Sequence, residues 1–261
     1  EMCIRDRSYA KNEIWLIGTF HEENHYMTPD SLTIIFNKIK PDLILIELEK
    51  KHFTKDFNFN TEKYPIEDFL TTNENIASYH YQQLNGTLIR SFDVNGRNEF
   101  YRKEKYHEKE NKMFSEMLNI YKEDKFSESC RIDFEILLQT LKTYSELKFN
   151  SLQESNSDLA TKFLSLKNKI NFELMISIIK RTDELKEWLE FAELRKEFWD
   201  RRNKIMAENI AKYSNEFKGK QIIVLVGNDH KYALLDLLEE KNIKVKNYYK
   251  EWNETATKNV W

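Results

Sequence analysis

Two histidines follow apolar segments of this chain at the same spacing from a glycine. Gly18-Thr19-Phe20-His21 comes directly after the segment IWLI, and Gly227-Asn228-Asp229-His230 comes directly after IIVLV. Imidazole serves both as a metal ligand and as a general base at neutral pH. Because glycine lets the backbone turn sharply, each imidazole can point into a crevice beyond its segment. The two turns predict one site shared by His21 and His230; the alternative is that each histidine packs locally.

Acidic residues end two further apolar segments. Glu47 closes the run LILIE, and Asp93 closes LIRSFD. A carboxylate is costly to bury unless it meets a cation, a metal ion or a proton. We therefore predict that Glu47 is the third functional group, as a metal ligand or a general base, and that Asp93 lies near the site. A Glu47 that simply reaches solvent is the alternative.

The segment ELKEWLEFAELRKEFWDRRNKIMAENIAKY has the apolar periodicity of an amphipathic helix. Arg202 lies at the edge of its apolar stripe, and Asn209 lies beside Arg202 two turns later, whereas Arg201 falls on the solvent side. A half-buried guanidinium needs an anion. We predict that Arg202 stabilises an oxyanion, with Asn209 beside it; a structural ion pair is the alternative.

His21 also begins the sequence His-Glu-Glu-Asn-His, which matches the zinc-peptidase motif H-E-x-x-H in its letters. That motif requires a helix that places both histidines on one face. Here an apolar segment and Gly18 precede it directly, and its interior pair is polar. We therefore expect no zinc-peptidase helix. Glu22 and Asp229, which adjoin the two histidines, are predicted to surround the site rather than to form it.

Five short apolar runs predict strands, and helical patterns lie between them. Runs that are apolar on both faces are typical of a buried parallel sheet. One helix is predicted to begin near Pro29, and another to cover about residues 66–84. We predict an α/β fold with a mixed, largely parallel sheet flanked by helices, whose strand ends gather the site. The predicted strands are Ile14–Ile17, Leu43–Leu48, Thr87–Phe92, Gln221–Val226 and Lys244–Tyr248.

The middle of the chain has a different pattern. Residues 99–217 contain no proline and no convincing strand, and their apolar residues recur every three or four positions. We predict a large all-helical insertion or cap there, between the third and fourth strands, within a single integrated domain. Its α/β core is predicted to comprise residues 13–98 and 218–250. Residues 1–12 lack periodicity and are interpreted as a tail or a remnant of non-native sequence.

Composition excludes several classes of protein. The net charge is −3, without the basic stripe that phosphate backbones require, so no nucleic-acid partner is expected. No apolar run approaches the ~18 residues of a membrane helix, and residues 1–12 lack the apolar core of a signal peptide. The two cysteines, Cys3 and Cys130, form neither a metal spacing nor a disulfide framework. We expect a cytoplasmic protein without a membrane span.

The segments LIGTFHEEN, PDLILIELE, DRRNKIMAENI and IIVLVGNDH appear in the order expected of the TraB/PrgY–Tiki family, and the chain resembles that family over Ile14–Val245 in outline. The family belongs to a superfamily with the erythromycin esterases and the haem-uptake ChaN proteins. The segment from Arg202 to Asn209 is similar to the erythromycin esterase motif R-D-x-x-M-A-E-N, with Asn203 in place of its aspartate. The resemblance implies an α/β sandwich with a helical cap, and a divalent metal (Mn, Co or Zn) held by His21, Glu47 and His230.

Three functions remain open at this point. The first is a hydrolase of a peptide or a small-molecule ester, using metal-bound hydroxide, or using His21 as base while Glu47 orients water and Arg202 polarises the carbonyl. The second is a haem or small-ligand binding protein of the ChaN type. The third is a non-catalytic regulatory or interaction protein. Proximity of His21, His230 and Glu47 would favour the first.

Overall fold

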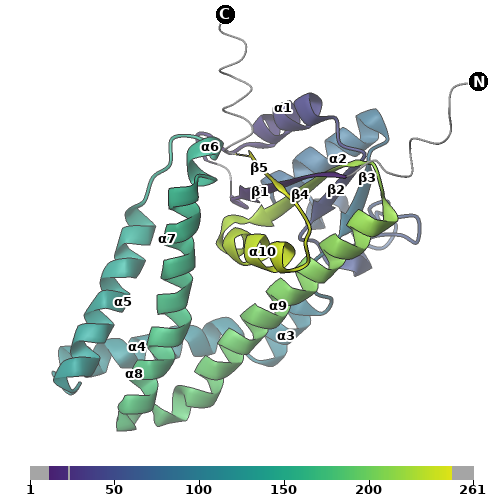
Figure 1. Cartoon of the computed structure of the whole chain (residues 1–261). Helices are drawn as coiled ribbons and strands as arrows, with labels where there is room; N and C mark the ends of the chain where they lie inside the picture. Colours follow the sequence, from purple (N-terminus) through teal and green to yellow (C-terminus); the bar gives the residue numbers. More distant parts are fainter. Residues whose placement is uncertain (1–11, 23, 249–261) are drawn as a thin grey trace, which may run out of the picture. The chain divides into compact units, whose positions relative to one another are not determined.

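The computed structural model describes residues 12–22 and 24–248 (Figure 1). Contacts within this part divide the chain into two compact units, which are described separately. The sheet unit comprises residues 12–95, 149–162 and 203–248, and the helical unit comprises residues 96–148 and 163–202. The predicted tail, residues 1–12, lies outside the described residues except for Asn12.

The sheet unit is built on a five-stranded sheet whose order is β3-β2-β4-β1-β5. Every pairing between these strands is parallel, so the sheet is wholly parallel rather than mixed. The α/β fold is confirmed, and each predicted strand matches an observed one to within two residues at either end. The strands are β1 (Glu13–Thr19), β2 (Leu43–Ile46), β3 (Leu88–Ser91), β4 (Gln221–Gly227) and β5 (Lys246–Asn247).

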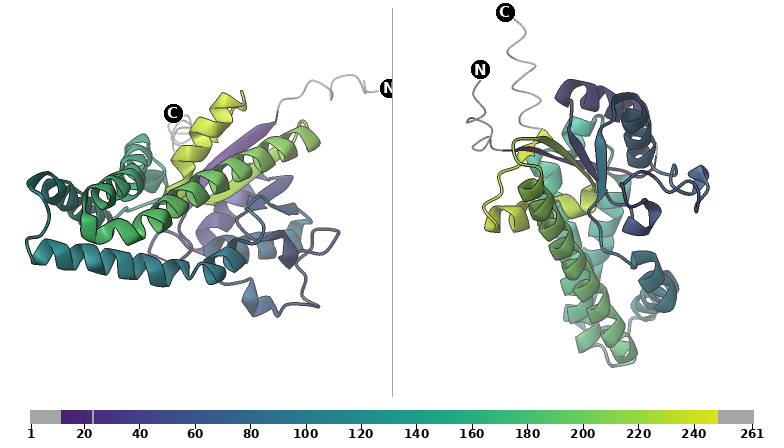
Figure 2. Two further views of the ribbon diagram at one scale, coloured as in Figure 1. Left: turned by 90° about the horizontal axis from the view of Figure 1, so that it is seen from below. Right: turned by 90° about the vertical axis from the view of Figure 1, so that its right-hand side faces the viewer.

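Helices cover both faces of the sheet, as the edge-on view of Figure 2 shows. Successive residues of a strand point to opposite faces. Ile17, Ile44 and Ile223 accordingly pack with α1 (Pro29–Ile39) and α2 (Asn73–Asn85), in one apolar core. Their strand neighbours, among them Leu16, Leu45 and Val224, pack with α10 (Asn228–Glu240) and the carboxyl-terminal part of α9 (Leu189–Glu216). This double burial explains why the strands are apolar on both faces.

Capping residues set where the helices begin. Thr28 and Ser31 form a reciprocal capping box before α1, which starts at Pro29 as predicted. The hydroxyl of Thr72 accepts a hydrogen bond from the Asn75 amide, so α2 starts only at Asn73. The helix predicted from residue 66 is therefore wrong in its first part, where a short 3-10 turn, η3 (Ile66–Asp68), precedes the cap. The first turn of α2 consequently lies where a helix interior was expected.

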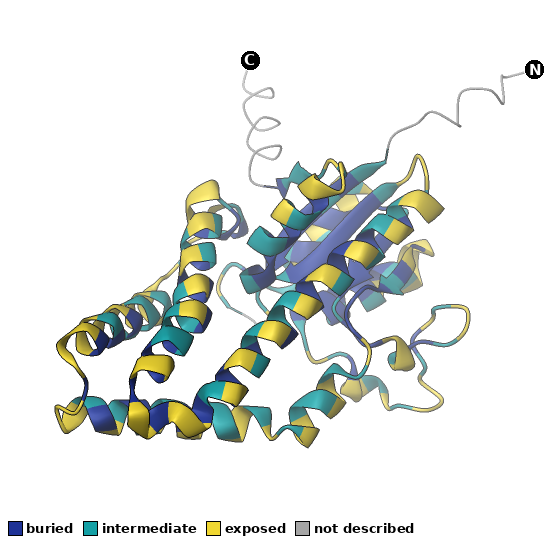
Figure 3. Cartoon of the chain, turned by 60° about the horizontal axis from the view of Figure 1, so that its bottom comes forward, coloured by how far each residue is buried: buried dark blue, intermediate teal, exposed yellow. Residues whose placement is uncertain are grey.

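The helical unit contains no strand among its described residues, which confirms the all-helical insertion. Its helices are buried along one side only, as the alternating buried and exposed turns of Figure 3 show. Met117, Phe134 and Ile178 lie at the centre of its core. Its elements are α3 (Arg97–Lys103), α4 (Tyr106–Lys122), α5 (Glu128–Glu146), most of α7 (Asp158–Lys169), the π-helical turn η4 (Ile170–Leu174), α8 (Met175–Arg181), η5 (Asp183–Trp188) and the start of α9.

The boundary of the helical unit differs from the predicted one, residues 99–217. Residues 149–162, which include the short helix α6 (Leu152–Ser155), group with the sheet unit, and so does the end of α9. The reason is packing: Leu152 lies in one core of the sheet, and Met206 and Ile210 lie in the other. None of the helices in the described part of the chain is long and apolar enough to cross a membrane.

Candidate functional site

The topology of the sheet brings three chain segments to one edge. β4 lies between β1 and β2, and all three run in the same direction. Gly18 pairs with Val226, and Thr19 pairs with Gly227, so β1 and β4 end side by side. In a parallel sheet the residues just beyond the carboxyl ends of the strands form the usual ligand site. The segments that carry His21, Glu47 and Gly227 therefore leave the sheet together.

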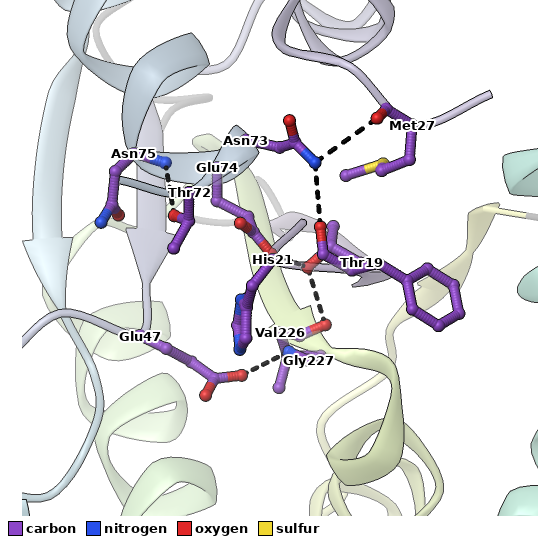
Figure 4. A network of polar contacts seen from close by, with 11 residues as sticks. Thr19, His21, Met27, Glu47, Thr72, Asn73, Glu74, Asn75, Val226 and Gly227 are labelled. Carbon is purple, nitrogen blue, oxygen red and sulfur yellow. Dashed lines mark hydrogen bonds and ion pairs between the residues drawn. The ribbon is translucent and has the colours of Figure 1, made fainter. Parts of the chain in front are cut away.

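His21 and Glu47 meet above Gly227 (Figure 4). A Cβ atom placed on this glycine would lie 3.4 Å from Glu47 Oε1 and 3.5 Å from His21 Nε2, so both side-chain tips flank a single point. The backbone N–H of Gly227 donates a hydrogen bond to Glu47 Oε1. Gly227 is also the N-cap of α10, and the amino end of a helix favours a carboxylate. Because Gly227 has no side chain, no Cβ atom occupies the point between these two tips.

A second carboxylate, Glu74, lies behind His21. Glu74 Oε1 is 3.1 Å from His21 Nδ1, so this nitrogen carries the hydrogen and Nε2 is the atom on the side of Glu47. The Glu74 side chain is 6% exposed, whereas that of His21 is 53% exposed. A buried carboxylate behind an exposed imidazole fixes the ring and its tautomer, both in metal sites and in catalytic dyads.

The environment of Glu74 keeps it ionised. Burial raises the pKa of this carboxyl, but the hydrogen bond and positive charge of His21 and a hydrogen bond from Thr19 outweigh that cost and hold the pKa below its ordinary value. The Thr19 hydroxyl lies within hydrogen-bonding distance of both Glu74 Oε1 and the Val226 carbonyl. Glu74 Oε2 is buried without a hydrogen-bond partner among the described residues. The charge of Glu74 is thus directed at His21.

The first turn of α2 also holds the backbone around His21. The Asn73 N–H donates to the His21 carbonyl at 3.3 Å, and the Asn73 side chain donates to the Phe20 carbonyl at 3.1 Å. The described residues of 20–28 form no helix, so the sequence His-Glu-Glu-Asn-His lacks the geometry of a zinc-peptidase motif. His25 is exposed, with its ring against Tyr26.

His230 has a different environment from His21. It is 4% exposed and lies in the first turn of α10. Its Nδ1 is 2.6 Å from Asn203 Oδ1. An amide oxygen only accepts hydrogen bonds, so Nδ1 carries the hydrogen here as well. His230 therefore has a neutral partner, Asn203, whereas His21 has a carboxylate partner, Glu74.

The predicted metal ligands are only partly brought together. Within residues 12–22 and 24–248, no three His, Cys, Asp or Glu side chains form a group that could hold a metal ion. His21 and Glu47 meet, as described above, while His230 is buried against Asn203. A ligand set of His21, Glu47 and His230 therefore stays a prediction.

Two of the other predicted residues, Asp93 and Asn209, bind backbone groups just beyond β3. Asp93 is buried and accepts a hydrogen bond from the Val94 N–H at 2.7 Å. Asn209 donates to the Phe92 carbonyl at 2.9 Å, which ties the end of β3 to α9. Glu22 is exposed next to His21, and Asp229 is half-buried next to His230. Arg202 is buried and is the last residue of the helical unit, so its role as an oxyanion donor stays a prediction.

Sequence reasoning missed Glu74 and Asn73. The signal for both was present in Thr72-Asn73-Glu74, because a threonine followed by polar residues is a common start of a helix. A helix that begins there places the two side chains in its first turn, at the same edge as His21.

No protein-family model matches the chain, and comparisons with curated proteins and with solved structures also give no match. The function is therefore argued from the geometry of the site.

Proposed function

We propose that the chain is a hydrolase in which His21 accepts and returns a proton at the carboxyl edge of the sheet. The observation that carries this proposal is the arrangement of Glu74, His21 and Glu47. Glu74 Oε1 lies 3.1 Å from His21 Nδ1. Glu47 Oε1 and His21 Nε2 both lie beside the point above Gly227 that a Cβ atom would occupy. His21 is also the most accessible of the three, as a group that meets substrate must be.

The proposed chemistry follows from these contacts. A water molecule between His21 Nε2 and Glu47 would lose its proton to Nε2 as it attacks a carbonyl carbon. Glu74 stabilises the imidazolium that forms, and Glu47 orients the water. The imidazolium then gives its proton to the leaving group, so His21 ends in its starting form. The resemblance to TraB/PrgY–Tiki proteins favours a peptide or a small ester as the substrate.

His21 and Glu47 also fit as two ligands of a divalent ion such as Mn²⁺, Co²⁺ or Zn²⁺. The fit rests on the carboxylate behind the imidazole, which is the usual outer partner of a metal-bound histidine, and on the position of His21 Nε2 and Glu47 Oε1 beside one point above Gly227. His230 is the third ligand implied by the resemblance. A bound ion would lower the pKa of its water toward ~7. The cysteine content favours a cytoplasmic location, which is part of the same proposal.

The test is turnover of a panel of p-nitrophenyl esters and fluorogenic peptides, with and without added Mn²⁺, Co²⁺ or Zn²⁺. We expect His21→Gln and Glu47→Gln each to lose at least about 100-fold in kcat/KM. His25→Gln and His80→Gln are matched controls, because both histidines are exposed and neither lies in the site. Both controls should keep wild-type turnover.

Equal turnover in wild type and His21→Gln would overturn the proposal. A wild type that turns over nothing in the panel, but gains a Soret band with haem that His21→Gln lacks, would instead favour the binding function. Metal analysis of the purified protein, compared with His21→Gln and Glu47→Gln, tests the metal-bound form separately.

A further inference from the structure

A second cluster of buried polar groups lies beside the glycine turn that precedes His21. The Gly18 N–H donates to Asn156 Oδ1 at 2.7 Å, and Asn156 Nδ2 donates to the Gly18 carbonyl at 2.8 Å. Asn156 is fully buried. β5 pairs with β1 only at Trp15 and Leu16. At Gly18 the side-chain amide of Asn156 therefore takes the place that a neighbouring strand would have.

Lys231 holds this amide in one orientation. Its Nζ donates to the Asn156 carbonyl at 2.8 Å and to Asn156 Oδ1 at 2.9 Å, and also lies 3.3 Å from Asn247 Oδ1. Lys231 is fully buried in the first turn of α10. Since an ammonium group only donates, the atom of Asn156 that it contacts must be oxygen. The amide nitrogen is thereby left to bind the Gly18 carbonyl.

The same short segment also contacts the second glycine turn. Asn228 Nδ2 donates to the Ser155 carbonyl at 3.0 Å. A Cβ atom on Gly18 would lie 2.1 Å from Asn228 Oδ1, so the first turn needs glycine to accommodate a residue of the second. Ser155 and Asn156 thus bind both Gly-x-x-His turns, from a part of the chain far from either in sequence.

We propose that Asn156, clamped by Lys231, is a positioning residue that aims His21 at Glu47. The loop that carries His21 is held on one side by Asn73 and on the other by the pairing of Gly18 with Asn156. Loss of the second attachment lets the turn shift while the remaining contacts of the sheet persist. The catalytic consequence of this inference rests on the proposed hydrolase function, but the effect on the position of His21 does not.

The experiment compares Asn156→Ala, Asn156→Asp and Lys231→Met with wild type. Asn156→Asp keeps the size of the side chain and the acceptor for Lys231, but it removes the donor to the Gly18 and Leu152 carbonyls and adds a negative charge. Asn150→Ala is the matched control, because Asn150 lies in the same segment and its side chain bonds to the exposed Glu154 rather than to Gly18. The ring resonances of His21 are followed by NMR of histidine-labelled protein and identified by their loss in His21→Gln.

We expect the His21 resonances to shift in each of the three variants and to stay in place in Asn150→Ala. kcat should fall about 10- to 100-fold with KM nearly unchanged, as for a displaced catalytic group. Unshifted His21 resonances in Asn156→Asp and Lys231→Met would overturn the inference, even if Asn156→Ala does not fold. If wild type lacks turnover, the hydrolase proposal fails, and the NMR comparison still decides the role of Asn156.

Discussion

Two pairs of a carboxylate and a nitrogen base, one from each unit of the protein, are buried in opposite ways. In the helical unit, Arg195 is 3% exposed and its partner Glu110 is 34% exposed. In the sheet unit the carboxylate, Glu74, is 6% exposed, and its partner His21 is 53% exposed. One pair buries the cation and the other buries the anion.

Under the proposed function, this difference separates a structural pair from a reactive one. Arginine stays charged at every relevant pH, so a buried Arg195 cannot exchange a proton. It packs on the Phe172 ring and donates to Met175 Sδ, and burial raises the pKa of the neighbouring Tyr106 to about 12. An imidazole titrates near neutrality. The sheet unit buries Glu74 and leaves His21 in contact with solvent, which is what the proposed role of His21 as a general base requires.

Glu74→Gln should produce the largest effect. Glutamine keeps the shape and an acceptor for His21 Nδ1 but removes the charge that stabilises an imidazolium. We expect kcat/KM to fall by about 10²- to 10⁴-fold, with the protein still folded at neutral pH. Steady-state kinetics together with circular dichroism would measure both. Unchanged kcat/KM would show that Glu74, like Glu110, has a structural role and no part in catalysis.

Glu110→Ala should show the opposite pattern. It leaves Arg195 buried without its carboxylate, and we expect the free energy of unfolding to fall by about 2–4 kcal/mol. The loss is smaller than the ~3–5 kcal/mol of a fully buried pair because Glu110 is itself 34% exposed. Turnover per folded molecule should not change. Glu135→Ala is the matched control, since Glu135 pairs with Arg131 on the surface and its loss should cost less than about 1 kcal/mol. If urea denaturation shows that Glu110→Ala and Glu135→Ala lose the same free energy of unfolding, the pair of Arg195 and Glu110 stabilises the protein no more than a surface pair does.

Gly18→Ala should destabilise the sheet unit. The new methyl group would overlap the buried Asn228 side chain, which is held by Ser155 and cannot move without losing that bond. We expect the free energy of unfolding to fall by about 1–3 kcal/mol, as for overpacked cores. Unaltered stability in thermal and urea unfolding would show that Asn228 can rearrange.

Gly227→Ala should act on turnover rather than on stability. The φ angle of Gly227 is −51°, which alanine adopts freely, and the methyl group would only touch Glu47 and His21. We expect stability to stay within about 0.5 kcal/mol of wild type. The methyl group would occupy the point above Gly227, so kcat/KM should fall about tenfold. Full activity would show that the reacting group binds elsewhere.

The smallest and most specific predicted effect is on how the free energy of unfolding changes at acid pH. The pKa of Glu74 is lowered in the folded protein from its ordinary value of 4.5. Its stabilising contribution is therefore complete above that value and is lost as the pH falls through the lower, folded pKa. Urea denaturation across the acid range should show a shallower loss of stability in Glu74→Gln than in wild type. Parallel curves would indicate that Glu74 is not preferentially ionised in the folded state.

The strands could be predicted from the sequence because segments buried on both faces are apolar throughout. The proximity of His21 and Glu47 could not be predicted from the apolar strands alone. It requires β4 to lie between β1 and β2, and no local pattern encodes which strands are neighbours. Glu74 was missed because residues 66–84 were interpreted as one helix, whereas the Thr72 cap delays its start.

The boundary of the helical unit could not be predicted for a similar reason. Residues 149–162 lie within the range predicted as the helical insertion, yet they group with the sheet unit. Two features attach them there, the apolar contact of Leu152 and the hydrogen bonds of Asn156 with Gly18. A buried asparagine that pairs with a distant backbone leaves no periodic trace in a sequence.

The central position of β4 has a consequence for the order in which the protein assembles. β4 pairs with both β1 and β2, although some 170 residues separate it from β2 in the chain. A nascent chain that has emerged only as far as α9 thus has its first three strands but lacks the one that joins β1 to β2. Such long-range pairing is slow to form and exposes apolar strand edges meanwhile. A chain without β4 also lacks Gly227, beside which His21 and Glu47 lie, so under the proposed function such a chain would lack the complete site.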